Sequence, residues 1–404
     1  MTKEIQIKES ITDKNSDFNV KFFKLNKLDI DSPTKVIDAK KVDYSFFKGI
    51  ERDLKNIIFE TSKAATPDTI NNILRGTDAN IKQAFGYLNW VSNYENVISI
   101  TLEFNPFDEY RNIENDLSGF FDYYYQFSKT MLFVPNIRTI ENIYKTTQKG
   151  TLQKIGERPL ISYEEYLNFV DSAFRVLQYK NKKPIFVPIS LKLDINEIRS
   201  LTKAYLKNEY FNFWIDFEGA ATTNPTKLAK IRAFLREVDT QKRFDDIIIH
   251  STNMRREITS NINKQESPSS DILTSLSGAN FVGVNREPSF KPENPPPYEE
   301  LQRIREHKAR VFRAPSYYYE KIVGLKGANT QLLDQNVNAT FNAVALNQEF
   351  SKQSTEFLKH SSIKEYICDK KMIIEYKDGE LINTLFYDKT RPVQKTLEPW
   401  FVDV

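Results

Sequence analysis

The stretch IFVPISLKLDINEIRSLTKAYLKNEYFNFWIDFEG, from Ile185 to Gly219, decides the fold class. It begins and ends with short apolar, β-rich runs, Ile185 to Leu193 and Phe211 to Phe217. The segment between these runs carries apolar residues at intervals of three and four, which predicts a helix between two strands. Parallel strands need such a crossover, so the stretch indicates a β/α unit of a parallel sheet.

The same alternation extends along the chain in both directions. The other strand candidates are Asn56 to Glu60, Val97 to Phe104, Met131 to Pro135, Asp246 to His250 and Asn280 to Val284. Helical spacing recurs between several of them, and Leu228, Ile231 and Leu235 show it well. An eighth strand could be Arg310 to Ala314, or the run Val20 to Leu25 could close or cap the bottom of the barrel. We predict a TIM-type (β/α)8-like barrel, with an open doubly wound sheet as the alternative.

Four regions follow from composition. Residues 1–17 are polar without an apolar period, which predicts a disordered tail, and residues 18–290 form the predicted barrel. Residues 291–301 are rich in proline and form a stiff connector. Residues 302–404 are a C-terminal extension with a long amphipathic helix and a β-hairpin around Asp378-Gly379. The stripe on that helix would contain Val337, Phe341, Val344, Ala345 and Phe350.

Composition excludes several classes of protein. Hydrophobic residues make up 40% of the 404 residues and charged residues 27%, as in a globular protein. The net charge of +3 provides no global field for nucleic acid or membrane, so such binding would need a local patch. The single cysteine, Cys368, excludes intrachain disulfides and thiolate-pair metal sites. With no leader or apolar span recognised, we expect a cytoplasmic protein with no membrane partner, and homo-oligomerisation stays open.

The run FWIDFEG carries the strongest chemical signal. Asp216 and Glu218 are two residues apart, which puts both carboxylates on one face of a strand that is otherwise apolar. Partly buried carboxylate pairs have raised proton affinity and suit general acid or base catalysis. The alternative is a structural salt bridge to a basic residue at a neighbouring strand end, such as Arg138, Lys192 or Arg286.

Other strand ends add polar candidates. His250 ends the run DIIIH and is a candidate general base or substrate contact, although a histidine bonded to a loop carbonyl is an equal alternative. The candidate substrate-binding residues at strand ends are Lys192, Arg255, Asn285 and Arg286. No histidine pair has metal-ligand spacing, and neither a P-loop nor a GxGxxG motif is present, so we expect no metal and no cofactor.

A basic, aromatic segment follows the proline-rich connector. Between Leu301 and Lys326 there are seven Lys or Arg residues against two Glu, interleaved with tyrosines. Cations that meet phosphates and rings that stack on bases are typical of nucleic-acid grooves, and we expect RNA rather than DNA. The candidate nucleic-acid contacts are Arg310, Arg313, Tyr317, Tyr318, Lys321 and Lys326. The alternative is a solvated basic helix whose tyrosines pack on the barrel.

The stretch from Ile185 to Pro288 resembles the second half of the tRNA-guanine transglycosylase barrel in element order and residue types. The resemblance rests on Ile185 to Gly219 and on SSDILTSLSGANFVGVNREP, which is similar to the segment leading to that family's nucleophile strand. It implies displacement of a base through a covalent glycosyl-enzyme intermediate. The family's aspartate-serine-glycine-glycine-phenylalanine-glutamine motif is absent, Asn285 stands where an acid is wanted, and its cysteine zinc site is impossible here. No nucleophile is therefore assigned.

Three functional hypotheses follow. The first is a glycosyltransferase-type barrel enzyme that acts on nucleic acid, with tRNA modification as its setting. The second is a non-catalytic barrel that serves as a nucleic-acid-binding or assembly subunit. The third is a barrel enzyme with a small-molecule substrate, since polar strand ends are not specific to one substrate class.

Overall fold

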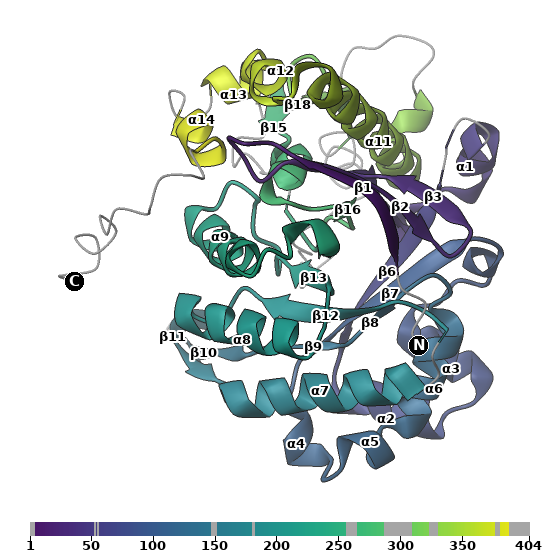
Figure 1. The fold of residues 1–404 in the computed structure, drawn as a ribbon. Coiled ribbons are helices and arrows are strands. Elements are labelled where there is room, and N and C mark those ends of the chain that lie inside the picture. The colour runs from purple at the N-terminus through teal and green to yellow at the C-terminus, as the bar shows by residue number, and fades with distance from the viewer. Residues whose placement is uncertain are drawn as a thin grey trace.

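The computed structural model describes residues 5–51, 54, 56–146, 152–179, 182–255, 265–286, 309–322, 330–375 and 380–387. Parallel strands lie at the centre of this part of the chain and helices lie around them (Figure 1). The proline-rich connector predicted at 291–301 and the basic residues at 302–308 lie outside the described residues.

Ten short strands build the centre of the fold. They are β4 Thr34–Lys35, β5 Ile37–Asp38, β6 Ile58–Ala65, β7 Glu95–Leu102, β8 Leu132–Phe133, β9 Asn136–Ile137, β12 Ile185–Ser190, β13 Asn212–Asp216, β14 Ile248–Thr252 and β16 Phe281–Val282. Six form a sheet in the order β4-β16-β14-β13-β12-β8, and four form a sheet in the order β5-β6-β7-β9. All neighbours are parallel.

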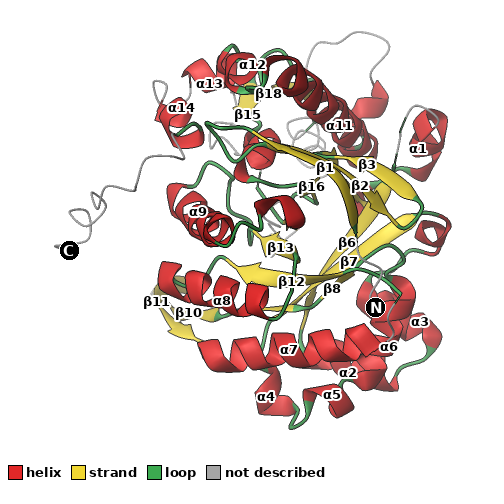
Figure 2. Ribbon diagram, in the orientation of Figure 1, coloured by secondary structure: helices red, strands yellow, loops and turns green. Residues whose placement is uncertain are grey.

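The six-stranded sheet curls into half a barrel (Figure 2). This confirms the predicted α/β class, and each of the seven strands predicted from Asn56 onward overlaps a parallel strand of the structure. Arg310 to Ala314 is wrong as the eighth strand, because it pairs antiparallel in a separate sheet. Val20 to Leu25 also pairs antiparallel outside the parallel sheets, but its Phe23 and Leu25 pack in the apolar cluster inside the parallel strands, so this run caps the interior, as the alternative predicted. The remaining parallel segment is β4 with β5, which is too short to show a period of its own.

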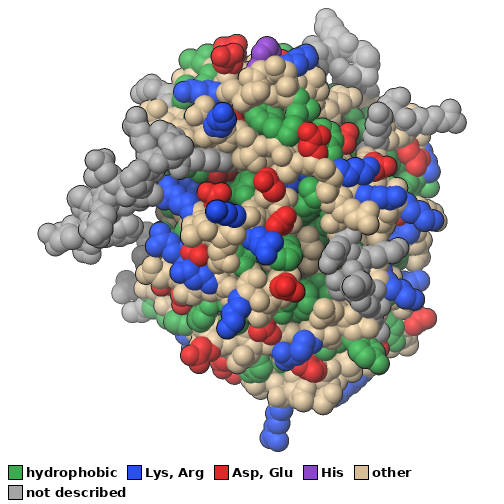
Figure 3. Space-filling model, in the orientation of Figure 1, with side chains coloured by type: hydrophobic (Ala, Val, Ile, Leu, Met, Phe, Trp, Pro, Cys, Tyr) green, Lys and Arg blue, Asp and Glu red, His purple; other side chains and the backbone are tan. Residues whose placement is uncertain are grey.

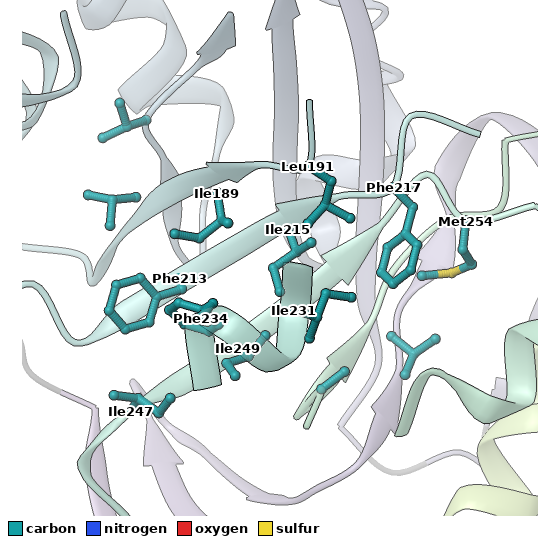
Figure 4. Close-up of a cluster of buried hydrophobic side chains, with 14 of the residues drawn as sticks. Ile189, Leu191, Phe213, Ile215, Phe217, Ile231, Phe234, Ile247, Ile249 and Met254 are labelled. Carbon is teal, nitrogen blue, oxygen red and sulfur yellow. The ribbon is translucent and has the colours of Figure 1, made fainter. Parts of the chain in front are cut away.

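Helices cover the outer side of the parallel strands. The larger ones are α2 Pro67–Arg75, α3 Asp78–Phe85, α6 Ser118–Phe127, α7 Tyr163–Tyr179, α8 Ile195–Lys207 and α9 Pro225–Thr240. Local sequence fixes where they start: Thr66 and Asp194 form capping boxes, and Asn224 caps α9 ahead of a proline. Figure 4 shows the resulting core, where Phe234 of α9 packs among Phe213 and other apolar side chains of β12 to β14.

A second apolar cluster fills the inner side of the curled strands. It contains Phe133, Phe186, Trp214 and Phe281, all almost completely buried. The Phe133 and Trp214 rings are stacked with centroids 5.4 Å apart, and the indole nitrogen of Trp214 donates to the Val134 carbonyl at 2.9 Å. Aromatic side chains thus fill the space between the amino-terminal halves of the curled strands. Polar side chains lie nearer the carboxyl ends.

The N-terminal residues form an antiparallel sheet of β1 Gln6–Thr12, β2 Asn19–Leu25 and β3 Leu28–Asp31. The disordered tail predicted for 1–17 is therefore wrong for residues 5–17. An edge strand can be held by backbone hydrogen bonds without an apolar period, and this is how β1 pairs with β2. The following turn is fixed by Asp13, a buried carboxylate that accepts bonds from Ser16 and from the backbone of Ile363.

The C-terminal part contains helices and a second antiparallel sheet. Its elements are β15 Glu266–Pro268, β17 Arg310–Arg313, β18 Tyr318–Lys321, α11 Gln335–His360, α12 Lys364–Cys368, α13 Lys371–Glu375 and α14 Glu380–Leu385. The hairpin predicted around Asp378-Gly379 is wrong: both described arms are helical, and Leu381 and Leu385 are buried one helical turn apart. The predicted long helix is confirmed as α11, although Phe341 of its expected stripe is exposed.

Short elements complete the described chain. They are α1 Tyr44–Ile50, α4 Pro106–Glu109, α5 Ile113–Asp116, the antiparallel pair β10 Ile140–Thr146 and β11 Leu152–Pro159, and the 3-10 turns Ala39–Lys41, Asn89–Asn93, Phe244–Asp246, Ser270–Ser277 and Thr330–Leu333.

Candidate active site at the carboxyl ends of the parallel strands

A buried polar network lies above the aromatic cluster. Its centre is the Glu60 carboxylate of β6, which accepts hydrogen bonds from Ser99 Oγ at 2.6 Å and from Thr252 Oγ1 at 2.7 Å. It also contacts His250 Nε2 at 3.0 Å and accepts from the backbone N–H of Val284 at 3.1 Å. These partners come from β7, β14 and the residues after β16, so one carboxylate connects both parallel sheets.

Glycine at position 283 leaves room for this network. A Cβ atom there would clash with a carboxylate oxygen of Glu60 and would stand 2.6 Å from His250 Nε2 and 2.7 Å from Thr252 Oγ1. These separations are too short for carbon against nitrogen or oxygen, so any larger residue must displace the polar atoms. Only glycine at position 283 therefore lets the backbone come this close to the side chains of Glu60, His250 and Thr252.

His250 occupies a different position from the predicted strand end. The strand is β14, Ile248–Thr252, which places His250 in its middle, completely buried between the rings of Phe133 and Phe281. Burial alone would raise the pKa of Glu60, but the nearby His250 and the hydrogen bonds to it together hold that pKa below its ordinary value. The prediction of an accessible general base at this position does not fit a side chain that is fully enclosed.

Asp216, the last residue of β13, is held by three donors. Its carboxylate accepts from Thr101 Oγ1 at 2.8 Å, from the backbone N–H of Glu218 at 2.7 Å and from Asn253 Nδ2 at 3.0 Å. Asn253 in turn accepts from Ser62 Oγ at 3.0 Å. Asp216 is 1% exposed and its hydrogen-bonding capacity is largely used, which suits a residue that positions its neighbours.

Glu218, two residues further on, has the opposite character. Within the described residues its Oε2 atom is buried without a hydrogen-bond partner. Burial, reinforced by the nearby Asp216 carboxylate, raises the pKa of Glu218, and Lys227 and Lys192 oppose that rise only in part. The two carboxylates predicted as a pair are therefore together at the strand ends, but they differ in solvation and in partners.

The backbone holds Glu218 in an unfavourable conformation. Its φ of +53° lies in the left-handed region, and Gly219 follows with φ +79°. A left-handed residue other than glycine, asparagine or aspartate costs on the order of 1 kcal/mol. Such strain persists where the surroundings overdetermine the conformation, here through the bonds from Glu218 N to Asp216 and from Gly219 N to the Asn253 carbonyl.

Lysines surround Glu218. Lys227 Nζ lies 3.6 Å and Lys192 Nζ 4.0 Å from Glu218 Oε2, and Lys230 lies one helical turn beyond Lys227 on α9. Lys192 was predicted as a substrate contact at the end of β12, and alternatively as a salt-bridge partner of one of the two carboxylates; its ion pair with Glu218 fits the second interpretation, and substrate contact stays a prediction. Lys227 and Lys230 were not among the predicted site residues. The available signal was their spacing of three residues directly after the Asn224-Pro225 helix start.

A second buried cluster surrounds Asn285. Its Nδ2 donates to Asp271 Oδ2 at 2.6 Å, and Tyr319 donates its hydroxyl to the same oxygen at 2.7 Å. Lys35 Nζ lies 3.5 Å from Asn285 Oδ1, and burial lowers the pKa of Lys35 to about 8. Asn285 therefore joins β16 to the C-terminal part through Asp271, a role that the sequence did not indicate.

The other predicted contacts are spread around the strand ends. Arg255 is half-buried and donates its backbone N–H to the Ala220 carbonyl at 2.9 Å, which joins the loops after β13 and β14. Arg286 is exposed, and its backbone N–H donates to the Met254 carbonyl at 2.9 Å. Both lie near the ends of their strands as expected, but no contact of their side chains with Asp216 or Glu218 is observed in the described chain.

The basic, aromatic segment is folded inward. Tyr317 is fully buried and donates to Glu349 Oε1 at 2.7 Å, whereas Tyr318 is half-buried and contacts Glu375 at 3.2 Å. Arg313 pairs with Glu320 at 2.8 Å. Tyr317 therefore offers no open stacking face in this conformation. The Arg310 side chain donates to backbone carbonyls. Lys321 is half-buried and stands opposite Arg310 in the backbone register of β17 and β18. Lys326 lies outside the described residues.

Comparisons with known proteins assign no relative. No protein-family model matches the chain, and no curated protein matches it either. Among the residues that the structure describes, no three His, Cys, Asp or Glu side chains are grouped so that they could hold a metal ion. In the same ranges, no helix combines the length and apolar character needed to cross a membrane.

Proposed function

We propose that the chain is a (β/α)8-barrel enzyme in which Glu218 acts as the general acid or base on a small polar substrate. The observation that carries the proposal is the contrast between two adjacent carboxylates. Asp216 is held by three donors, whereas Glu218 Oε2 has no donor in the described chain, a raised pKa and a strained backbone. An environment that raises the proton affinity of a carboxyl group at a strand end is typical of acid–base sites.

Closure into one barrel is supported where the two parallel sheets meet. Val36 lies between β4 and β5, and its N–H donates to Val282 of β16 at 2.8 Å, whereas the next residue, Ile37, pairs with Phe59 of β6. At the other junction, Val134 donates to Phe186 of β12, and Asn136 pairs with β7. When β4 with β5 and β8 with β9 are each counted as one strand, eight strands follow one another in sequence order, which is the order of a TIM barrel.

The position of the site fits this barrel. Asp216, Glu218, Lys192 and Asn253 all follow or end parallel strands, and reactions in such barrels take place at the carboxyl ends. Asp216 would fix the backbone of Glu218 and the amide of Asn253, and Glu218 would exchange a proton with the substrate. A carboxyl group with raised proton affinity remains protonated closer to neutral pH and can then serve as an acid.

A small substrate is favoured over a nucleic acid by the basic segment. Among its described residues Arg313 is ion-paired with Glu320, Arg310 donates to backbone carbonyls and Tyr317 is buried, so these three add little free cationic or stacking surface. Basic and acidic side chains are also interspersed over the face shown in Figure 3. Base exchange on tRNA, as the transglycosylase resemblance implies, and a non-catalytic binding role stay as alternatives.

The test compares wild type, Glu218→Gln and Glu114→Gln, the last an exposed glutamate of α5 paired with Arg175. Each protein is incubated with a small-molecule cell extract followed by mass spectrometry, and separately with tRNA and labelled guanine. We expect wild type and Glu114→Gln to convert one small molecule, and Glu218→Gln to be slower by about 10²- to 10⁴-fold. Guanine incorporation would support the transglycosylase alternative, and conversion that does not depend on Glu218 would refute the assigned role.

A further inference from the structure

Two lysines converge on one backbone carbonyl near Glu218, and a third lies beside Glu218 itself. Lys227 Nζ and Lys230 Nζ each donate to the Leu191 carbonyl at 3.0 Å, so the two nitrogens lie no farther apart than twice that distance. Lys192, the next residue after Leu191, places its own ammonium 4.0 Å from Glu218 Oε2. Three like charges are thereby held together at the ends of β12 and β13.

Local structure directs these side chains to the same place. Lys227 and Lys230 are three residues apart and lie on one face of α9. Helical side chains lean toward the amino terminus of their helix, and α9 begins just after the loop that carries Glu218. The N-terminal end of a 16-residue helix also adds a partial positive charge, so the helix strengthens the field of the lysines.

Apart from Glu218, the carboxylates nearby act on these lysines at longer range. Asp194 and Glu197 are engaged by backbone N–H groups in the capping box of α8, and Asp216 is held by three donors. Glu218 remains as the carboxylate in ion-pair distance of Lys227 and Lys192. Among the described residues the three lysines thus have one direct ion-pair partner, so most of their ammonium protons remain available to an anion such as a phosphate dianion.

Repulsion and burial make this arrangement costly without a ligand. Burial lowers the pKa of Lys227 and of Lys230; the Glu218 carboxylate opposes that fall in both, and the neighbouring Lys192 adds to it. The site nevertheless remains accessible, since the Lys192 side chain is 34% exposed and that of Lys227 is 13% exposed. An anion placed here would relieve the repulsion and would provide acceptors for ammonium protons that the Leu191 carbonyl does not engage.

We propose that Lys192, Lys227 and Lys230 bind a phosphate dianion of the substrate and place it beside Glu218. The assignment deepens the proposed function, because it identifies the substrate as a phosphorylated small molecule. A bound dianion next to Glu218 would also favour the neutral, protonated form of its carboxyl group. The group that anchors the substrate would thus help Glu218 to keep the proton that it donates as an acid.

Binding is tested with inorganic phosphate on the intact chain, without any need for turnover. Affinity is measured by calorimetric titration and by the phosphate-dependent rise in melting temperature. We expect Lys227→Met and Lys230→Met each to weaken phosphate binding at least about tenfold. The matched control is Lys203→Met, because this lysine lies on the neighbouring helix α8 and is 63% exposed. It should bind phosphate like wild type.

Three further measurements test whether the site prefers a dianion and whether Glu218 controls its binding. Sulfate, whose charge stays fixed over the working pH range, should bind more tightly as pH falls and Glu218 becomes protonated. Glu218→Gln should bind sulfate more tightly than wild type and lose this pH dependence. Acetate should bind much more weakly than either dianion, and acetate binding as tight as phosphate would overturn the dianion assignment.

The outcomes separate this inference from the proposed function. Unchanged phosphate affinity in both Lys227→Met and Lys230→Met, with both variants folded by circular dichroism, overturns the anion site. Equal loss in Lys203→Met overturns it as well, since binding would then follow general surface charge. Lysine-dependent phosphate binding without any Glu218-dependent reaction would uphold the anion site and refute the enzyme.

Discussion

The exchange of Gly283 for alanine tests whether the buried polar network is as tightly packed as its distances indicate. The added Cβ would meet Glu60, His250 and Thr252 at once. The backbone cannot retreat easily, because Gly283 N donates to the Ser251 carbonyl at 2.7 Å and Val282 pairs with both β14 and β4. The side chains of the network must therefore move.

The cost follows from the bonds that such movement breaks. Glu60 accepts from Ser99, Thr252 and the Val284 N–H and pairs with His250, all in a fully buried setting. A hydrogen bond to a charged group contributes about 1.5–3 kcal/mol. Displacing Glu60 far enough to admit a methyl group should break at least two of these contacts. We expect Gly283→Ala to lower the free energy of unfolding by about 3–5 kcal/mol.

A matched substitution has the opposite expected sign. Gly49 lies inside helix α1, and a Cβ atom there would meet nothing within 4 Å. Because alanine is the better helix former, Gly49→Ala should raise the free energy of unfolding by about 0.5–1 kcal/mol. The same chemical change thus separates a steric effect at position 283 from a general effect of adding a methyl group.

Both variants are measured by urea unfolding, followed by far-ultraviolet circular dichroism and by tryptophan fluorescence. Trp214 lies in the adjacent aromatic cluster and reports on the strand interior. The reasoning is refuted if Gly283→Ala unfolds within about 0.5 kcal/mol of wild type, since no charged hydrogen bond would then have been lost. It is also refuted if Gly49→Ala destabilises the protein to a similar extent.

Three further predictions concern charge and strain. Burial lowers the pKa of Lys21 to about 7, so between that pH and the ordinary lysine value the unfolded chain binds more protons than the folded one. The free energy of unfolding should therefore rise with pH in this range, by up to about 1.4 kcal/mol per pH unit. Lys21→Met should flatten this rise in urea unfolding between pH 7 and pH 10, and an unaltered slope would contradict the assignment. Glu218→Gly and Glu218→Gln both remove the counter-charge of Lys227 and Lys192, but only the glycine relieves the left-handed strain, so Glu218→Gly should have the higher free energy of unfolding by about 1 kcal/mol; equal stability of the two variants would contradict the strain. Arg313→Ala should leave RNA affinity and its salt dependence unchanged, since Arg313 is paired with Glu320; a shallower salt slope by filter binding would revive the nucleic-acid hypothesis.

Local periodicity identified the parallel strands because each is long enough, or apolar enough, to carry a pattern. It missed β4 with β5, since five residues around Val36 show no period and are defined by their neighbours. It also mistook the C-terminal apolar runs for a hairpin. Short apolar runs such as Met372 to Ile374 suit either structure, and packing of Leu381 and Leu385 against the core selects the helix.

The candidate site divides in the same way. The spacing of Asp216 and Glu218 placed both at one strand end, and the structure keeps them together. Nothing in the spacing could separate their roles, because the three donors to Asp216 come from residues that are distant in sequence or set by the turn. Glu60 and Gly283 likewise meet only through the closing of strands that are more than 200 residues apart.

The sequence by itself determined the β/α alternation, the outer helices with their caps and the two carboxylates, because these depend on contacts between near neighbours. Only the tertiary structure decided which carboxylate keeps an oxygen without a hydrogen-bond donor in the described chain, which lysines lie beside it, and that Tyr317 and Tyr319 of the basic segment are buried. Those properties depend on burial and on partners brought together by long-range strand pairing, and a one-dimensional pattern records neither.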